Sequence, residues 1–415
     1  MTPSVLSNLF PAWPVSVDPL AMGALALVLA AVCGELVFRF LRLPRITGYS
    51  LAGLVAGPSL LGWIGADGGV GGVRLLIDLS LALLLFELGV RVNLRWFRHN
   101  PMILASSVAE AALAFVAVFL VVTLLGYQLE IALVVATVSM TTSPAVVMRV
   151  AGELRARGQV TDRLLVMTAL NVVYAVIVAN LVLGYIHRSY GGDWLAALLH
   201  PLYQLGGSAL VALLLAKVFQ VLRRHFDPQQ EQASLLLFAL LMLTMALLQT
   251  LKLPALLAPL LAGILVKHAD PRPHLWPRHF GSVGGVLVIL LFVMTGAALT
   301  WQHLFAGGLV ALALIAVRSG GKLLGVLAFG RWSGITLRQS LALGRALSPL
   351  SGVAFVLTAD IGRLYPALNA ELGGIVLSMI AILELLGPVI VQQSLAWAGE
   401  SRPQGNAEGG EKHDA

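Results

Sequence analysis

The chain has 415 residues, of which 58% are hydrophobic and 11% charged, and its mean hydropathy is +0.89. A soluble domain of this size needs more polar side chains to cover its surface, so the composition predicts an all-α polytopic membrane protein. The single cysteine, Cys33, excludes a disulfide framework and a cysteine-based metal site, and the net charge of +7 reflects membrane orientation rather than binding to nucleic acid.

Apolar segments follow one another along the chain, and a membrane span needs about 20 such residues. Segments of this length number about 13, so we expect about 13 membrane spans. They are predicted at 21–40, 46–63, 73–91, 101–125, 128–150, 163–186, 201–222, 232–250, 253–267, 282–300, 304–329, 338–360 and 370–397.

Lysine and arginine residues gather in every second connection between these segments. Because cytoplasmic loops are the basic ones, the N-terminus is predicted outside and the C-terminus in the cytoplasm. Residues 1–20 are then an extracytoplasmic segment, and 399–415 a disordered cytoplasmic tail. The basic connections hold Arg39, Arg42 and Arg45, then Arg91, Arg95 and Arg98, then Arg155, Arg157 and Arg163, then Arg223 and Arg224, then Lys267, Arg272 and Arg278, and finally Arg331 and Arg338.

Two motifs recur seven segments apart, which places the partners in opposite directions across the membrane. Leu-Ala-Gly occurs in Gly48–Pro58 and in Ala258–His268, and Ser-Pro lies in the middle of Thr141–Val147 and of Leu347–Val353. This pattern predicts two inverted repeats, at about 21–190 and 232–398. A proline within a span breaks the helix and frees backbone groups that lipid cannot satisfy, so two equivalent breaks predict an ion site near the middle of the membrane.

The sequence resembles the monovalent cation:proton antiporter superfamily, which includes bacterial sodium or potassium/proton exchangers and glutathione-gated potassium efflux proteins. The resemblance implies a sodium/proton antiporter-like fold with two crossed broken helices in a core, a panel that forms a homodimer, and alternating access in the bacterial inner membrane. It covers about residues 20–398 and rests on the segments ITGYSLAGLVAGP, LLFELGVRVNL, TTSPAVV, FVMTGAALT, RSGGKLLGVL and ILELLGPVI.

The ion site of the family falls, by position, on the two breaks and on the segment 163–186. Where relatives carry an acid or an Asn-Asp pair, this chain has Asn171 and Val172. Lys322 matches the lysine that pairs with that acid in relatives. The resemblance thus implies a cation site that lacks a carboxylate on this segment and that consists of Thr142, Ser143, Asn171, Ser348 and Ser351.

Two basic residues, Arg318 and Lys322, lie one helical turn apart inside the segment 304–329. Like charges at this spacing repel, and charges within a membrane need partners. The acids in the middle of spans are Glu110, Glu384 and Asp78. Glu110 is the first expected partner, because its segment is the repeat mate of the one that carries Lys322.

Proton coupling requires a group that releases a proton when the cation binds. Lys322 and Asn171 lie at similar depth, so we expect Lys322 to donate to the side-chain oxygen of Asn171. Desolvation and the neighbouring cation favour the neutral amine of Lys322, while burial favours the neutral acid of Glu110, so either can carry the proton. The alternative is a fixed network that only holds the core together. Nearer the predicted cytoplasmic ends, ordinary ion pairs are expected, Glu35 with Arg39 and Glu87 with Arg91.

The function predicted is exchange of Na⁺ or K⁺ for protons. Two alternatives remain: a transport-inactive relative that acts as a membrane scaffold or sensor, and an uncoupled cation leak in which Asn171 binds the ion without releasing a proton. The sequence contains no HExxH motif, no GxSxG motif and no acid pair at hydrolase spacing, so an enzyme is not expected. No cofactor is expected.

Overall fold

The computed structural model describes residues 19–64, 71–223, 231–269, 281–301 and 307–401, and the elements in these ranges are helices. Most of the predicted segment 1–20, residues 402–415 of the predicted tail, and three of the arginines in basic connections lie outside the described residues: Arg224, Arg272 and Arg278. Seven described helical segments are long and apolar enough to cross a membrane, one of which, Leu129–Glu153, consists of two short helices, and three further apolar helices are shorter. The chain is therefore an all-helical polytopic membrane protein.

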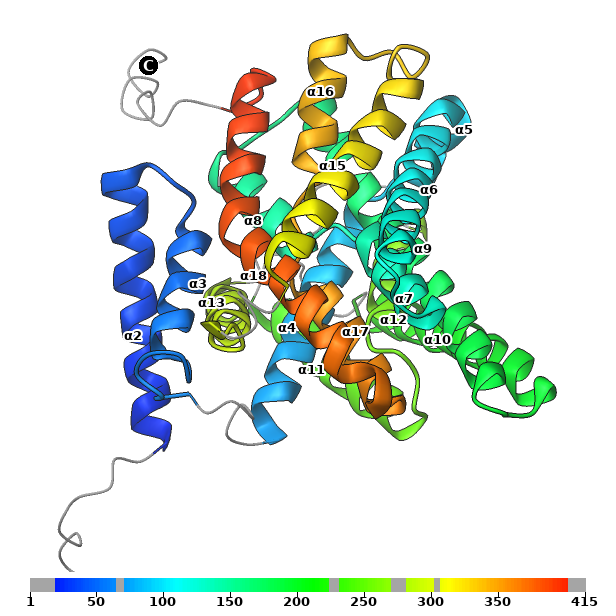
Figure 1. The fold of residues 1–415 in the computed structure, drawn as a ribbon. Coiled ribbons are helices and arrows are strands. Elements are labelled where there is room, and N and C mark those ends of the chain that lie inside the picture. The colour runs from blue at the N-terminus through cyan, green and yellow to red at the C-terminus, as the bar shows by residue number, and fades with distance from the viewer. Residues whose placement is uncertain (1–18, 65–70, 224–230, 270–280, 302–306, 402–415) are drawn as a thin grey trace, which may run out of the picture.

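One group of helices forms a row that we call the panel. Within it α2 packs on α3, α3 on α13, α13 on α4, α4 on α12 and α12 on α10, while α11 lies against α4 and α10. Figure 1 shows α2 at one edge of the molecule and α10 at the other. The panel consists of α2 (Pro19–Leu36) with the short π-helix η1 (Val37–Leu41), α3 (Arg45–Ala56), α4 (Gly71–Arg91), α10 (Trp194–Arg223), α11 (Glu231–Thr250), α12 (Leu257–Ala269) and α13 (Gly281–Ala297).

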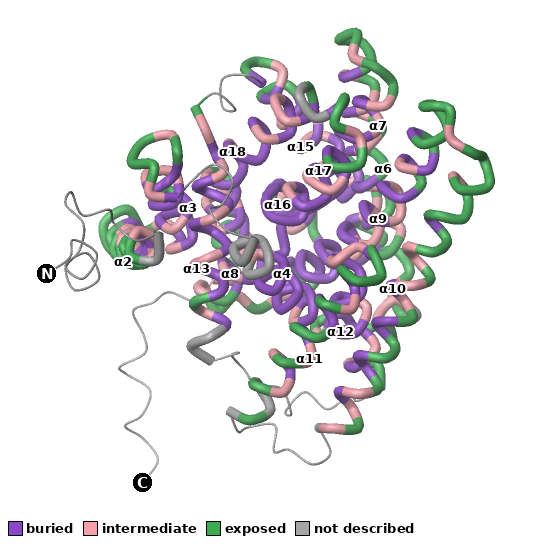
Figure 2. The backbone as a smooth tube through the Cα atoms, turned by 90° about the horizontal axis from the view of Figure 1, so that it is seen from below, coloured by how far each residue is buried: buried purple, intermediate pink, exposed green. Residues whose placement is uncertain are grey.

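The remaining helices form a second group that we call the core bundle. In Figure 2 the buried backbone is concentrated around α16, α8 and α4, whereas α2 and α10 are largely exposed. Apolar surface at those outer positions is what a protein surrounded by lipid presents. The core bundle consists of α5 (Leu94–His99), α6 (Pro101–Leu124), α7 (Leu129–Met140), α8 (Pro144–Glu153), α9 (Gln159–Ser189), α15 (Gly308–Gly330), α16 (Leu337–Ala346), α17 (Gly352–Leu364) and α18 (Pro366–Trp397).

Several helix ends differ from the prediction. α3 ends at Ala56 rather than near residue 63, because Pro58 lacks an amide hydrogen and disfavours helical backbone at Gly57. α9 begins at Gln159, earlier than the predicted 163, because its first turn is polar. α10 begins at Trp194, earlier than the predicted 201, because the helix continues through Pro201. The other predicted segments coincide with one helix or one broken pair.

Both predicted breaks are present. α7 stops at Met140 and α8 starts at Pro144, where the Ser143 side chain accepts a hydrogen bond of 3.3 Å from the amide of Val146. Proline suits the first position of a helix, since its missing N–H would have no helical partner there, and serine is a common cap before it. The second break separates Ala346, at the end of α16, from Gly352, at the start of α17.

Glycine allows α15 to approach α6 closely. A Cβ atom added at Gly325 would lie 2.3 Å from the Cα of Glu110 and 2.4 Å from its amide nitrogen, closer than any ordinary contact. Gly321, one turn earlier, meets the backbone of Ala114 in the same way. These glycines place the backbone of Glu110 beside the helix that carries Lys322.

The predicted disorder from residue 399 is wrong for the first residues of the tail. The Glu400 carboxylate accepts hydrogen bonds from the amides of Val160 (2.8 Å) and Thr161 (2.7 Å), and from the Thr161 hydroxyl (2.7 Å). These amides belong to the first turn of α9, where a carboxylate satisfies free N–H groups and complements the helix dipole. Gly399 and Glu400 are thus part of the folded core bundle.

Candidate functional site

The two helix breaks contact each other directly inside the core bundle. The amide of Ser143 donates to the carbonyl of Pro349 (3.0 Å), and the hydroxyl of Thr142 donates to the carbonyl of Leu347 (3.0 Å). The hydroxyls of Ser143 and Ser351 also share a hydrogen bond. Each break therefore supplies partners for polar groups that the other leaves unpaired. The four predicted residues on the breaks lie here and are at most 4% exposed: Thr142, Ser143, Ser348 and Ser351.

Arg318 binds the carbonyl groups that the breaks leave free. Its guanidinium donates to the carbonyl of Ser139 from Nε (2.9 Å), to that of Ser348 from Nη1 (2.6 Å) and to that of Thr141 from Nη2 (2.5 Å). The expectation that this buried cation needs an acid was wrong. The carboxyl ends of α7 and α16 carry partial negative charge and unpaired carbonyls, and the planar fork of arginine reaches both ends at once.

Lys322 and Glu110 form the predicted ion pair. Lys322 Nζ lies 2.8 Å from Glu110 Oε2, and the side chains of both residues are 0% exposed. The same ammonium donates to the carbonyl of Met140 (3.0 Å) and to the hydroxyl of Thr142 (3.2 Å). All three of its N–H donors are therefore used, as a buried lysine requires.

Asn171 joins this pair through its amide nitrogen. Nδ2 donates to Glu110 Oε1 (2.5 Å) and to the Thr142 hydroxyl (3.1 Å). The prediction that Lys322 donates to the Asn171 oxygen was wrong, because Oδ1 has no hydrogen-bond partner in the part of the chain that the structure describes. Only the amide nitrogen can face a carboxylate favourably, which fixes the orientation of the side chain. Asn171 thus presents one open, buried acceptor.

The other two predicted acids are not partners of these cations in the described hydrogen bonds. Asp78 is buried on α4, with 8% of its surface exposed. Glu384, on α18, is fully buried and accepts hydrogen bonds from Ser50 on α3 (3.3 Å) and from Thr295 on α13 (2.8 Å). Sequence reasoning missed both hydroxyl residues, although each lies in a segment that carries the family resemblance, GYSLAGLVAGP and FVMTGAALT.

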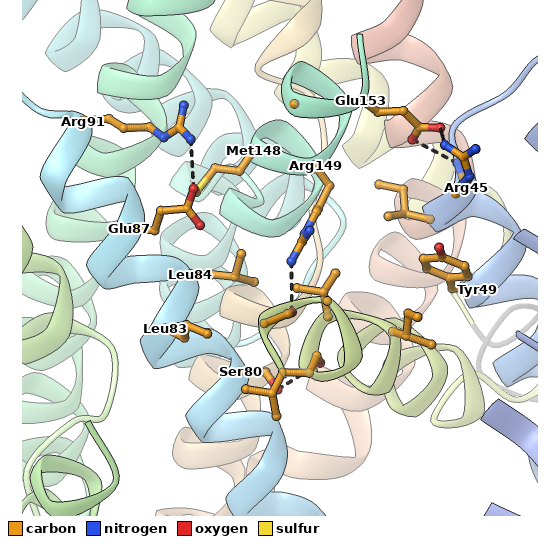
Figure 3. A pocket seen from close by; sticks show the side chains of 17 residues that line it. Arg45, Tyr49, Ser80, Leu83, Leu84, Glu87, Arg91, Met148, Arg149 and Glu153 are labelled. Carbon is orange, nitrogen blue, oxygen red and sulfur yellow. Dashed lines mark hydrogen bonds and ion pairs between the residues drawn. The ribbon is translucent and has the colours of Figure 1, made fainter. Parts of the chain in front are cut away.

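A cavity of about 470 Å³ opens between the panel and the core bundle. It lies among α3, α4, α8 and α13, and Figure 3 shows Arg149 of α8 pointing into it, where Nη2 donates to the carbonyl of Gly284 on α13 (3.0 Å). Arg45 on α3 pairs with Glu153 at the end of α8 (3.1 Å), so two arginine contacts connect the panel with the core bundle here. The sequence analysis did not single out Arg149 or Glu153.

Arg45, Arg91 and Arg149 line this cavity, so it lies on the side of the molecule where the basic connections gather. Arg91 pairs with Glu87 (2.9 Å) and Arg39 with Glu35 (2.5 Å), which confirms both of the ordinary ion pairs predicted near the cytoplasmic ends.

No group of three or more His, Cys, Asp or Glu side chains that can hold a metal ion occurs among the described residues. The oxygen atoms at the crossed breaks are instead hydroxyls, carbonyls and the Asn171 amide.

The sequence profile described as "Sodium/hydrogen exchanger, transmembrane" matches residues 25–397, which is most of the chain. The chain belongs to the sodium/hydrogen exchanger family. This exchanger is accordingly a transporter of cations and protons rather than an enzyme, and an integral multi-pass membrane protein. No curated protein matches its sequence.

Two solved structures of the sodium proton antiporter MjNhaP1 from Methanocaldococcus jannaschii resemble the exchanger in fold. The structure at pH 8 has a TM-score of 0.66 and 20% sequence identity, and the match covers 92% of this chain and 97% of that chain. The structure from an electron microscopy map has a TM-score of 0.72 and 18% identity, with 94% and 100% covered. The antiporter fold predicted from the sequence is confirmed.

Proposed function

We propose that this exchanger carries Na⁺ or K⁺ out of a bacterial cell in exchange for protons, across the inner membrane and by alternating access. The observation that carries the proposal is the buried polar network where the two broken helices cross. Its charged pair, Lys322 with Glu110, is internally balanced, and the charge of Arg318 is offset by two helix ends. A cation that enters this site therefore meets oxygen atoms, while the one side-chain charge in excess, that of Arg318, is held against the two helix ends.

The cation ligands in this proposal are the open Oδ1 of Asn171 and the hydroxyls around the breaks. Hard cations such as Na⁺ and K⁺ prefer oxygen ligands, and irregular backbone between half-helices is where transporters of this type bind ions. Asn171 keeps a coordinating oxygen at a position where relatives carry an acid, but it cannot release a proton. The hydroxyl ligands are assigned to Thr142, Ser143, Ser348 and Ser351.

Alternating access in this proposal is a movement of the core bundle against the panel. The cavity lies between these two groups and on the basic side, which is the predicted cytoplasmic side. In this proposal the cavity opens to the cytoplasm, the N-terminus lies outside and the C-terminus lies inside. Arg45–Glu153 and Arg149–Gly284 are contacts that must change when this side closes.

The proposed architecture has two inverted repeats and about 13 membrane crossings of roughly 20 residues each. We propose that two copies of the chain form a homodimer. Packing of the panel supports the repeats. α3 packs on α13 and α4 packs on α12, and in the repeat scheme these two pairs are equivalent. Both use glycine at the contact: a Cβ at Gly53 would meet the carbonyl of Val293 at 2.2 Å, and one at Gly89 would meet that of Leu260 at 2.3 Å.

The first test measures proton efflux from everted membrane vesicles after addition of Na⁺ or K⁺. Wild type is expected to respond, and Asn171→Ala is expected to need about tenfold more cation for the same response, which corresponds to about 1.4 kcal/mol for one lost ligand. Asn180→Ala is the matched control, because Asn180 lies on the same helix, is also buried and bonds only to the backbone carbonyl of Val176 among the described contacts.

The outcomes separate exchange from its alternatives. A silent wild type that gains activity with Asn171→Asp identifies a degenerate exchanger whose role is that of a scaffold or sensor. Cation flux without proton movement identifies a leak. If Asn171→Ala and Asn180→Ala respond equally to the cation, the ion does not bind at the crossed breaks.

A further inference from the structure

We propose that Glu384 is the proton-binding group of this exchanger, held where the core bundle meets the panel by the hydroxyls of Ser50 and Thr295. The inference rests on the proposed cation/proton exchange and names the proton site that Asn171 no longer provides. It assigns the proton to a helix different from the one that carries the acid in relatives.

The location of Glu384 is unlike that of Glu110. Its side chain extends from α18 of the core bundle to two helices of the panel, α3 and α13, and is 0% exposed. Both hydroxyls contact the same oxygen, Oε1, while Oε2 has no hydrogen-bond partner among the described residues. If the carboxyl group is ionised, this oxygen is a buried charged acceptor without a donor, which favours the protonated acid.

The hydrogen bonds of Thr295 fit both protonation states of Glu384. Thr295 Oγ1 lies 2.9 Å from the carbonyl of Leu291, 3.2 Å from that of Phe292 and 2.8 Å from Glu384 Oε1, but a hydroxyl has a single hydrogen. When the carboxyl group is protonated, it donates to Thr295, which donates in turn to a backbone carbonyl. When the carboxyl group is ionised, Thr295 turns its hydrogen toward Oε1, and Ser50 donates as well.

Most charged groups on the helices around Glu384 have other described partners. α13 contains no Asp, Glu, Lys, Arg or His, and Glu371 on α18 lies 13 residues away, about 20 Å along the helix. The charged residues on the helices packed against α18 have these described partners: Arg45 with Glu35 and Glu153, Arg149 with Gly284, Arg318 with the breaks, Lys322 with Glu110, Arg338 with the carbonyl of Trp397, Arg345 with the Trp397 ring, and Asp360 with Arg363. Glu130 lies in the first turn of α7. Tyr49, next to Ser50, lines the cavity.

Lys322 and Glu110 are less suited to change their protonation. Loss of a proton from Lys322 leaves the Glu110 carboxylate without its counter-charge, and protonation of Glu110 leaves the ammonium unpaired. Either step creates an unpaired buried charge, which is strongly unfavourable. Glu384 has no cationic partner in the described part of the chain, so its neutral acid is the form suited to the closed, dry contact between core bundle and panel.

The cavity supplies a route for the proton. Ile46 and Tyr49 of α3 line it and lie within about one helical turn of Ser50. Ile289 of α13 also lines it and precedes Thr295 by six residues, about 9 Å along the helix. A movement of the core bundle by about 9 Å relative to the panel is enough to bring water from the cavity to the carboxyl group of Glu384. The O–H bond of Glu384 then breaks, the proton leaves with water, and the carboxylate accepts hydrogen bonds from the hydroxyls of Ser50 and Thr295.

This site couples the proton to the cation through charge. The core bundle crosses either with Glu384 protonated and the cation site empty, or with Glu384 ionised and one cation bound. Both forms have the same net charge. The proposal therefore predicts electroneutral exchange of one cation for one proton.

The experiment uses the full chain in proteoliposomes that contain a pH-sensitive dye, with radioactive Na⁺ added at several pH values. Glu384→Gln imitates the protonated acid. We expect this variant to lose both the Na⁺ flux and the Na⁺-driven proton movement, because its core bundle with a cation bound carries a positive charge that no ionised Glu384 balances. Glu371→Gln is the matched control on the same helix, where the side chain is exposed, and should retain both fluxes. A wild-type ratio of proton to Na⁺ flux in Glu384→Gln overturns the proposal.

A second measurement decides the case in which Glu384→Gln moves neither ion. Infrared spectra of the wild type should contain the carbonyl band of a buried protonated carboxylic acid, and that band should be missing in folded Glu384→Gln. Persistence of the band in the variant assigns the proton to another group and overturns the proposal. Thr295→Val, which keeps the shape of the side chain, should shift the band and the pH profile. A wild type without any ion flux refutes the exchange itself, while the band still reports whether Glu384 holds a proton.

Discussion

Gly325→Ala tests whether the close approach of α6 and α15 positions the Lys322–Glu110 pair. The added methyl group would lie 2.3 Å from the Cα of Glu110, whereas ordinary contacts begin near 3.4 Å, so the two backbones must separate by about 1 Å. Neither neighbouring atom can rotate away, because both belong to the backbone. The same movement extends the 2.8 Å contact between Lys322 Nζ and Glu110 Oε2 beyond hydrogen-bond distance.

The expected loss of stability follows from two contributions. Overpacking costs about 1–3 kcal/mol, and a broken buried ion pair costs about 3–5 kcal/mol when it is lost completely. The better helix propensity of alanine returns about 0.5–1 kcal/mol. Partial relaxation then gives a net loss of about 2–5 kcal/mol, together with reduced exchange activity.

The assay is thermal unfolding of the detergent-solubilised protein, followed by tryptophan fluorescence. Gly320→Ala is the control on the same helix, because a Cβ at Gly320 meets nothing within 4 Å. It should melt at the wild-type temperature or slightly above. If Gly325→Ala and Gly320→Ala melt alike, the backbone contact does not control the ion pair, and the argument from helix spacing is refuted.

Two further substitutions test the polar network by the same unfolding assay. Glu110→Gln leaves Lys322 as an unpaired buried cation and should cost about 3–5 kcal/mol, whereas Glu87→Gln removes a half-exposed pair and should cost no more than about 1 kcal/mol; equal effects would contradict the burial argument. Arg318→Lys keeps the charge but cannot donate to three carbonyls in one plane, so at least one buried carbonyl loses its partner, at a cost of about 1–3 kcal/mol. The exposed Arg363→Lys is the control and should leave the stability unchanged. An unchanged stability of Arg318→Lys would show that the planar geometry of the guanidinium is unimportant.

The sequence by itself determined the class of fold and several features of the site. Apolar segments of membrane length specify helices, because lipid cannot satisfy open backbone groups. Ser143–Pro144 and Ser348–Pro349 specify the breaks, because proline has no amide hydrogen to continue a helix. The pairing of Glu110 with Lys322 followed from repeat symmetry and from the cost of unpaired charge in a membrane.

Only the tertiary structure decided which groups meet across helices distant in sequence. The carbonyls of Ser139 and Ser348 are 209 positions apart, and no periodicity in the sequence indicates that one arginine binds both. The orientation of Asn171 depends on which of its neighbours is the carboxylate. Glu384 meets Ser50 across 334 positions, and this contact exists only because α18 packs against α3. Local patterns fix where helices form and break, whereas helix packing fixes the partners of their buried polar atoms.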